Sequence, residues 1–318
     1  MMRRRTLLAA TLPAGVILAG RAQAADGLKL AVGQKGNWYT SVAELGQRAG
    51  IFRKHDLELD ILYTQGSGET LQAVLSRSAE IGVAGGTLGA IGAFSKGAPI
   101  RILGSEATGA GDLYWYVRAD SPIKSLRDTN GKTIAFSTQG SSTNSVVLGF
   151  VDTFGIKPEL VATGGIPGTY TQVMSGQIDV GWSAAPYLLD AAEDGKIRIL
   201  GGGNDVPSMR EQTVRVNVAH AAVLETRKPI IERFVAAYRE TVVWMYQSAD
   251  AAKAYAEFAG TPERFVKRLR EEFFPHQAIW SDKVTGLDSL MADAVRFKFI
   301  PAPLSKEQIA QMIQIMPA

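Results

Sequence analysis

From Leu28 onward the sequence alternates short apolar runs with longer segments whose apolar residues recur at helical spacing. Strands joined by crossover helices give this pattern, which predicts an α/β fold with a mostly parallel sheet. The expected strands are 28–32, 57–62, 80–84, 100–103, 133–136, 179–182 and 197–200. The expected helices are 41–49, 69–76, 87–95, 143–154, 169–175 and 186–193.

The chain also resembles itself at an offset of 99 residues. Thr70, Val74, Ser76 and Gly82 meet the identical residues Thr169, Val173, Ser175 and Gly181. Such an internal repeat predicts two similarly built lobes. We expect lobe 1 to comprise residues 25–113 and 218–318 and lobe 2 residues 114–217, with a hinge at the chain crossings near 113–118 and 215–219.

The pattern changes beyond Val216, where no further strand is expected. Five helices are expected instead, at 229–247, 249–259, 262–274, 282–297 and 305–316. The apolar faces of these helices need a surface to cover, and we expect them to return the chain to lobe 1.

The N-terminus has the order of a secretory signal. Arg3, Arg4 and Arg5 precede fifteen uncharged residues, and the small residues of Ala22-Gln23-Ala24 follow, so we expect residues 1–24 to be removed. The run is too short for a transmembrane anchor, which needs about 20 residues. Arg4 and Arg5 also fit a twin-arginine signal, and the residues leave the export route open. The mature protein is expected in the periplasm.

Charge and cysteine content exclude several classes of protein. Residues 1–24 hold four arginines and no acid, so without them the formal charge changes from +3 to −1. This removes the electrostatic case for nucleic-acid binding. The chain has no cysteine, which excludes disulfides, thiolate metal sites and thiol nucleophiles.

Candidate binding residues follow the expected strands, because ligands of open parallel sheets gather at the carboxyl ends of the strands. The loops there are rich in glycine, hydroxyl and aromatic residues, and backbone N–H groups at helix starts favour an oxygen-rich or anionic group. Capping a helix is an equally good interpretation for Ser141, Ser142 and Thr143. Trp38 and Trp182 are expected to wall a pocket, with core packing as the alternative.

The serines and histidines of the sequence do not match known catalytic or metal-binding motifs. Ser141 and Ser142 lack the downstream glycine of a nucleophile elbow. His55, His220 and His276 are scattered and show no helical metal-ligand spacing, so we interpret all three as structural. We therefore expect no enzymatic activity, no metal and no cofactor.

The order of several motifs resembles the nitrate, sulfonate and taurine group of substrate-binding proteins of ABC importers, which share a fold with thiamine-pyrimidine-precursor proteins. The resemblance spans nearly the whole mature chain and rests on residues 50–59, 121–128, 130–132, 140–142 and 176–180 before Trp182 and Pro186. Arg77 and Glu80 stand where that family usually has glycine and aspartate.

The resemblance implies a two-lobed type II periplasmic-binding-protein fold, with a mixed sheet in each lobe and a hinge of two crossing segments. It implies a monomeric receptor that holds a small molecule between the lobes and presents it to the transmembrane subunits of an ABC permease. The binding residues carried over from the family are Asn37, Trp38, Ser67, Thr87, Ser141, Ser142, Thr143 and Trp182.

The ligand is expected to be a small organic anion, such as a sulfonate or carboxylate, since helix N-termini and hydroxyls converge and aromatic walls suit an organic tail. The alternatives are a heteroaromatic or pyrimidine-type ligand that stacks on tryptophan, or delivery of the ligand to a sensor rather than to a transporter.

Overall fold

The computed structural model describes residues 25–279 and 282–316, so the predicted signal segment 1–24 lies outside the described residues. The strands are β1 (Asp26–Val32), β2 (Leu57–Tyr63), β3 (Ile81–Gly86), β4 (Ile100–Thr108), β5 (Leu113–Arg118), β6 (Thr133–Phe136), β7 (Glu159–Ala162), β8 (Gly181–Ala184), β9 (Ile197–Gly202) and β10 (Thr213–His220). The helices are α1 (Val42–Arg48), α2 (Ile51–Lys54), α3 (Ser67–Leu75), α4 (Thr87–Ser95), α5 (Ser142–Phe154), α6 (Ile166–Met174), α7 (Leu189–Glu193), α8 (Ala221–Gln247), α9 (Ala249–Ala259), α10 (Arg264–Arg268), α11 (Leu287–Arg296) and α12 (Lys306–Met312).

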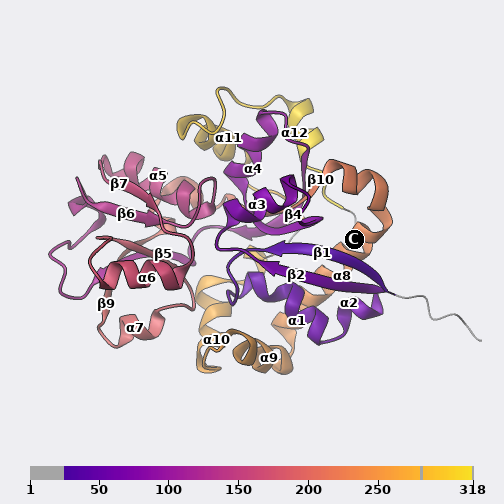
Figure 1. The fold of residues 1–318 in the computed structure, drawn as a ribbon, viewed down its shortest axis with the longest axis horizontal. Helices are drawn as coiled ribbons and strands as arrows, with labels where there is room; N and C mark the ends of the chain where they lie inside the picture. The colour runs from indigo at the N-terminus through magenta and orange to yellow at the C-terminus, as the bar shows by residue number, and fades with distance from the viewer. Residues whose placement is uncertain (1–24, 280–281, 317–318) are drawn as a thin grey trace, which may run out of the picture.

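The larger sheet has five strands in the order β2-β1-β3-β10-β4 (Figure 1). β1 pairs in parallel with β2 and β3, whereas β10 runs antiparallel to both β3 and β4. The sheet is therefore mixed, as the resemblance implied, and not mostly parallel, as the apolar pattern predicted. Every residue of the central strand β3 is buried, while the edge strand β2 alternates between buried and exposed positions, as strands at these two places in a covered sheet should.

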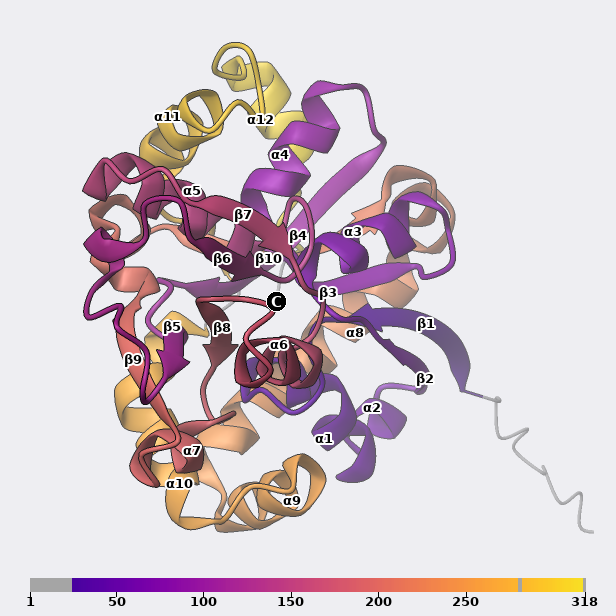
Figure 2. The ribbon, with the colours of Figure 1, turned by 60° about the vertical axis from the view of Figure 1, so that its left-hand side comes forward.

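Helices cover both faces of this sheet. A cluster of apolar residues from α3, α4, α11 and α12 packs on one face of β4 and β10. On the other side of the molecule α1, α2 and α8 pack together beside β1 and β2 (Figure 2). The expected return of the C-terminal helices to the first sheet is thus observed, with α9 beside α1 and α11 beside α4.

The chain between β4 and β10 builds two smaller sheets. β5 pairs antiparallel with β8 and β9, and β6 pairs in parallel with β7. A bridge between Ile134 and Val180 joins the two. The chain passes between the larger and smaller sheets through residues 109–112 and 203–212, and both strands proposed as hinges, β5 and β10, are paired on both sides. The predicted lobe limit at 217/218 falls inside β10.

The internal repeat corresponds to two similar units, β2-α3-β3 and β7-α6-β8. In the first unit the hydroxyls of Thr64 and Thr70 lie 2.7 Å apart, and in the second those of Thr163 and Thr169 lie 2.6 Å apart. Each pair is separated from the other by the same 99 residues. In both units, therefore, a threonine in the first turn of the helix forms a hydrogen bond with a threonine in the loop that follows the preceding strand.

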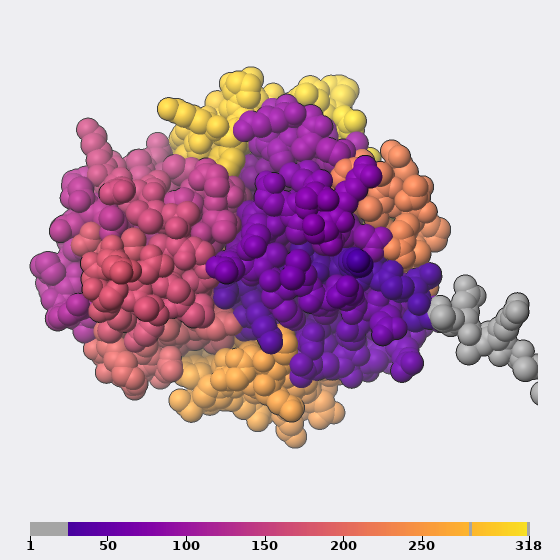
Figure 3. Space-filling view, viewed as in Figure 1, coloured from indigo at the N-terminus to yellow at the C-terminus, as the bar shows by residue number. Residues whose placement is uncertain are grey.

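The two groups of sheets lie against each other without a wide gap on the face shown in Figure 3, where the magenta and indigo surfaces meet along a seam. Within the described part of the chain, no helix combines the length and the apolar character that crossing a membrane requires.

Candidate functional site

A small cavity of about 20 Å³ lies where the loops of the larger sheet meet the start of α5 and the end of β8. That volume holds roughly one water molecule. Its walls come from both groups of sheets and consist of Gly33, Gln34, Asn37, Tyr39, Gly66, Ser67, Ala84, Leu113, Ser137, Ser142, Thr143, Trp182, Ala184 and Arg215.

The loop after β1 places Asn37 on the cavity wall. The hydroxyls of Thr40 and Ser41 both donate to the backbone carbonyl of Asn37, at 3.2 and 2.6 Å, and so fix the loop. The side-chain nitrogen and oxygen of Asn37 are buried, and neither has a hydrogen-bond partner among the described residues. Because unpartnered buried polar atoms are rare and costly, this amide is arranged for a ligand or a water molecule.

The loop after β2 places Ser67 on the same side of the cavity as Asn37, the side formed by the larger sheet. Ser67 is the first residue of α3, and its hydroxyl accepts a hydrogen bond from the backbone N–H of Ser142, the first residue of α5, at 2.9 Å. Nearby, the side-chain oxygen of Gln65 accepts from the N–H of Gly165 at 3.2 Å. Side chains from the loops of the larger sheet thus bind backbone N–H groups at the starts of α5 and α6, on the other side of the cavity.

The second rim is organised by a cluster of hydroxyls at the start of α5. Ser141 caps this helix by accepting from the N–H of Asn144 at 3.1 Å. The Thr143 hydroxyl lies 2.8 Å from those of Ser137 and Ser141. Trp182 closes this side of the cavity, and its indole N–H is buried without a partner in the described chain.

Arg215 is the charged residue of the cavity wall. The side chain is buried, and its two terminal nitrogens donate to the two carboxylate oxygens of Asp112, each at 3.0 Å. Its Nε donates to the Ser142 hydroxyl at 3.2 Å, and the guanidinium lies 4.6 Å from the centre of the Tyr39 ring. Although burial lowers the pKa of Arg215, the carboxylate of Asp112 raises it above the usual value, so the group stays charged.

Arg215 was not among the predicted binding residues. The sequence does hold a signal for it, because Arg215 and Asn217 interrupt the valines at 214, 216 and 218, where a buried strand normally has apolar residues. The same signal would not have identified Gln34 and Tyr39, which the structure also places on the wall.

Five of the eight predicted binding residues line the cavity, namely Asn37, Ser67, Ser142, Thr143 and Trp182. Among the described residues the wall does not include Trp38, Thr87 or Ser141. Trp38 packs edge-on against Tyr255 and Tyr246, with ring centres 4.8 and 5.7 Å away, and the guanidinium of Arg270 lies over it. The structure therefore agrees with the alternative interpretation, in which Trp38 packs in the core. Thr87 is the first residue of α4, and its buried hydroxyl has no partner in the described chain.

The histidines lie apart from this cavity. His55 contacts Glu240 at 2.8 Å, and the imidazole of His220 accepts a hydrogen bond from the N–H of Ala222 at the start of α8. In residues 25–279 and 282–316 no three histidine, aspartate or glutamate side chains come together in a group able to hold a metal ion.

The mixed sheets and their connections form the α/β fold of periplasmic binding proteins of type II, as the resemblance implied. The chain belongs to the NMT1/THI5-like family, whose sequence profile matches residues 42–252. A search of curated proteins found no match.

Solved structures share the fold at low sequence identity. The alkanesulfonate-binding protein SsuA of Xanthomonas axonopodis pv. citri, bound to MOPS, is 16% identical with a TM-score of 0.75 over 91% of this chain and 98% of that one. The periplasmic nitrate-binding protein NrtA of Synechocystis PCC 6803 is 13% identical with a TM-score of 0.68 over 90% and 84%. The desulfurization enzyme DSZB is 16% identical with a TM-score of 0.60 over 89% and 95%.

Proposed function

We propose that this protein is the periplasmic binding component of an ABC importer, which captures a small organic anion in the cavity and delivers it unaltered to the transmembrane permease. The observation that carries the proposal is the buried amide of Asn37, which has no partner among the described residues and lies on the wall of a cavity that the buried Arg215 also lines. The walls of this cavity come from the larger sheet and from the smaller sheets. The absence of cysteine from the chain separates it from enzymes that need a thiol.

An anion is supported by the donors that converge on the cavity. The nitrogens of Asn37 and Trp182 are unpartnered, and Arg215 adds a positive charge. The N-termini of α3 and α5 lie at the cavity, and separation of the two sides would free the Ser142 N–H that Ser67 now binds for an oxyanion. Sulfonates and carboxylates offer several acceptor oxygens to such a set.

A second candidate, a neutral heteroaromatic compound, is supported by two other atoms. The side-chain oxygens of Asn37 and Gln34 are also buried without partners in the described chain, and an oxygen of this kind needs a donor. Asp112 also neutralises the charge of Arg215 within the pair. A ring that carries both N–H and C=O groups would meet these atoms and stack against Tyr39 or Trp182.

Admission of either ligand requires the rims to separate, since a cavity of about 20 Å³ is too small for an organic anion. We propose that the larger sheet with its helices and the two smaller sheets with theirs move as two lobes, hinged at the crossings 109–112 and 203–212. The expected limit at 217/218 moves to the second crossing, because it would divide β10 within the larger sheet. Opening would break the Ser67–Ser142 and Gln65–Gly165 hydrogen bonds, and a ligand bound to both rims would replace them. Binding then shifts the equilibrium toward the closed form.

Closure depends on glycines that let the two backbones touch. A Cβ added to Gly89 of α4 would lie 2.3 Å from the backbone oxygen of Gly140, which is closer than atoms can approach. We expect Gly89→Ala to weaken ligand affinity about tenfold or more while the protein stays folded, because alanine is a good helix former and the contact with the Gly140 backbone exists only in the closed form. The Cβ would also lie 2.9 Å from Cδ1 of Leu71, the end of a flexible side chain that can shift. Gly27→Ala is the matched control, since a Cβ there meets nothing within 4 Å. Equal affinities of the two variants by titration calorimetry would contradict the closure proposal.

The ligand class is tested by a thermal-shift screen of residues 25–318 against alkanesulfonates including MOPS, aromatic carboxylates, nitrate and pyrimidines. A ligand at 100 times its Kd stabilises the folded state by about 2.7 kcal/mol, which raises Tm by several degrees. The proposal expects the largest shift from an organic sulfonate or carboxylate. A shift from an uncharged heterocycle alone would overturn it in favour of the second candidate.

Asn37→Asp separates the two candidates directly. The substitution keeps the shape, replaces the donor nitrogen with an oxygen and adds negative charge, so we expect it to weaken binding of the best anion about 100-fold or more. A heterocycle bound through its N–H groups would keep or gain affinity. Asn130→Asp is the control, because the exposed Asn130 accepts its hydrogen bond from Lys157 through an oxygen that aspartate retains.

A further inference from the structure

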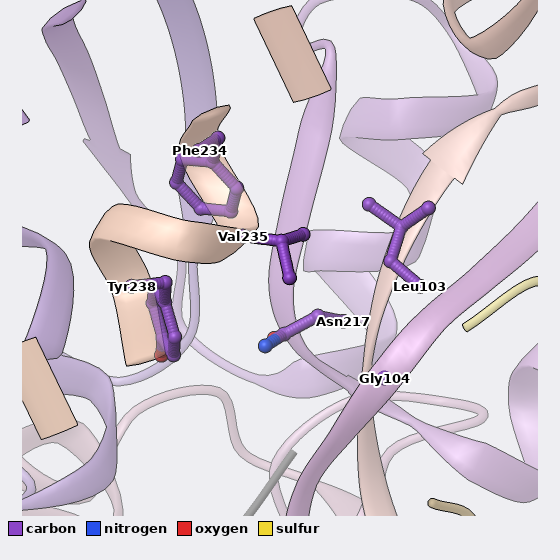
Figure 4. Close-up of a pocket in the computed structure, with 6 residues that line it drawn as sticks. All are labelled: Leu103, Gly104, Asn217, Phe234, Val235 and Tyr238. Atoms are coloured by element: carbon purple, nitrogen blue, oxygen red, sulfur yellow. The ribbon is translucent and has the colours of Figure 1, made fainter. Parts of the chain in front are cut away.

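A second small cavity, of about 10 Å³, lies between β4, β10 and α8 and is lined by Leu103, Gly104, Asn217, Phe234, Val235 and Tyr238. Figure 4 shows the amide of Asn217 and the ring of Tyr238 facing each other across it. These two polar groups meet at a carboxyl group that the binding mechanism above does not use, that of Glu106 in β4.

Glu106 is fully buried and has one partner for each oxygen. Tyr238 donates its hydroxyl proton to Oε1 at 2.7 Å, and Asn217 donates from Nδ2 to Oε2 at 2.6 Å. Burial raises the pKa of Glu106 to about 8, since the interior disfavours the charged form more than the hydrogen bonds favour it. At neutral pH the carboxyl group is therefore mostly protonated, and in this form Oε1–H donates to the Tyr238 oxygen while Oε2 still accepts from Asn217.

Asn217 connects this carboxyl group to the ligand cavity. Its side-chain oxygen accepts from the backbone N–H of Ala84 in β3 at 3.1 Å. The pairing of β3 with β10 is irregular between Val216 and Val218, and the Asn217 side chain supplies a partner for the Ala84 N–H at that irregularity. Ala84 has a φ of 64°, a conformation that residues with a side chain rarely adopt, and it lines the ligand cavity.

We propose that Glu106 is a positioning residue of the ligand cavity, which acts through Asn217 on the backbone of Ala84. Glu106 fixes the direction of the Asn217 amide, because an amide whose nitrogen is held by Glu106 must turn its oxygen toward Ala84. The bond to Tyr238 anchors the same carboxyl group to α8. The hydrogen bonds Tyr238–Glu106, Glu106–Asn217 and Asn217–Ala84 thereby fix the part of the ligand-cavity wall that β3 forms.

The other charged or titratable groups near Glu106 come from several elements. Arg215 of β10, Tyr39 before α1 and Tyr246 of α8 interact with it electrostatically. β3 and α4 carry no titratable side chain, and those of α12 are the exposed Lys306 and Glu307. His276, from the turn that packs on β4, lies 4.7 Å from the Tyr246 ring.

The test is amide hydrogen exchange by NMR on residues 25–318 without ligand, with the protection factor of Ala84 as readout and Leu30 of β1 as internal reference. Glu106→Leu removes the acceptor for Asn217, and we expect at least a tenfold loss of protection at Ala84 relative to Leu30. Glu106→Gln keeps an acceptor for Asn217 and a donor toward Tyr238, and we expect Ala84 to stay within threefold of the wild type. Tyr238→Phe leaves Asn217 bound and should resemble Glu106→Gln.

Two results would overturn this proposal. Equal losses at Ala84 and Leu30 in Glu106→Leu would mean that Glu106 stabilises the sheet as a whole. An Ala84 protection factor within threefold of the wild type in Glu106→Leu would mean that Asn217 holds the Ala84 N–H without Glu106. Where Glu106→Leu does not fold, equal losses at Ala84 and Leu30 in Glu106→Gln would overturn the proposal in its place. Because no ligand is present, a failed ligand screen leaves the test unaffected.

Discussion

Replacing Arg215 with leucine is expected to lower the free energy of unfolding of residues 25–318 by about 3 to 5 kcal/mol. The physical reason is that the substitution leaves Asp112 without its ion-pair partner. The Asp112 carboxylate is buried, and each of its oxygens accepts a hydrogen bond from Arg215. The variant therefore leaves a buried carboxylate without these partners. Urea denaturation followed by tryptophan fluorescence measures the change.

The matched control is Arg118→Leu, which makes the same substitution in an exposed pair with Asp120. Exposed ion pairs contribute little, so this variant should unfold close to the wild type. The double variant Arg215→Leu with Asp112→Leu should recover part of the lost stability, since no buried charge remains. Equal unfolding midpoints for Arg215→Leu and Arg118→Leu would show that Arg215 is not the buried partner described here.

Glu106 is expected to make stability depend on pH in an unusual direction. Its pKa is about 8 in the folded protein against an ordinary value of 4.5, so between these pH values the folded state holds a proton that the unfolded state has lost. Stability from this group is therefore full below pH 4.5 and is lost as the pH rises toward 8. From pH 5 to pH 8 the loss amounts to about 3 kcal/mol.

Glu106→Gln isolates this contribution because glutamine does not titrate. Denaturation of wild type and variant at pH 5, 6, 7 and 8 gives a difference in which the other titrating groups cancel. We expect the wild type to lose about 3 kcal/mol relative to the variant across this range. Parallel curves for the two proteins would contradict a protonated Glu106.

Much of the fold could be predicted from the sequence because its signals are local. The helix at Thr87–Ser95, the helix at Ala249–Ala259 and the strand at Thr133–Phe136 begin and end where the apolar pattern and the turn residues placed them. β7 was missed although it is as long as the predicted strand Thr133–Phe136, because Glu159–Ala162 has no buried position. β10 was missed altogether: no strand was expected after 197–200, yet Thr213–His220 forms one that continues beyond Val216. Its antiparallel pairing with β3 and β4 depends on distant parts of the chain and has no local signature.

The binding residues, too, could be predicted where their signal is local and not where it depends on distant parts of the chain. Ser67, Ser142 and Thr143 stand at helix starts, which the sequence marks. Arg215 was missed because its partners Asp112 and Ser142 lie 103 and 73 residues away. Trp38 was expected in a pocket from its glycine and asparagine neighbours. Its real surroundings, Tyr246 and Tyr255, come from C-terminal helices whose docking position no local pattern gives.

In the proposed function the two lobes close over one compound and leave it unchanged. Small-angle X-ray scattering of residues 25–318 is the decisive measurement, without and with a saturating amount of the compound that gives the largest thermal shift. We expect a smaller radius of gyration at saturation and full recovery of the intact compound. An unchanged radius at saturation, or conversion of the compound, would contradict it.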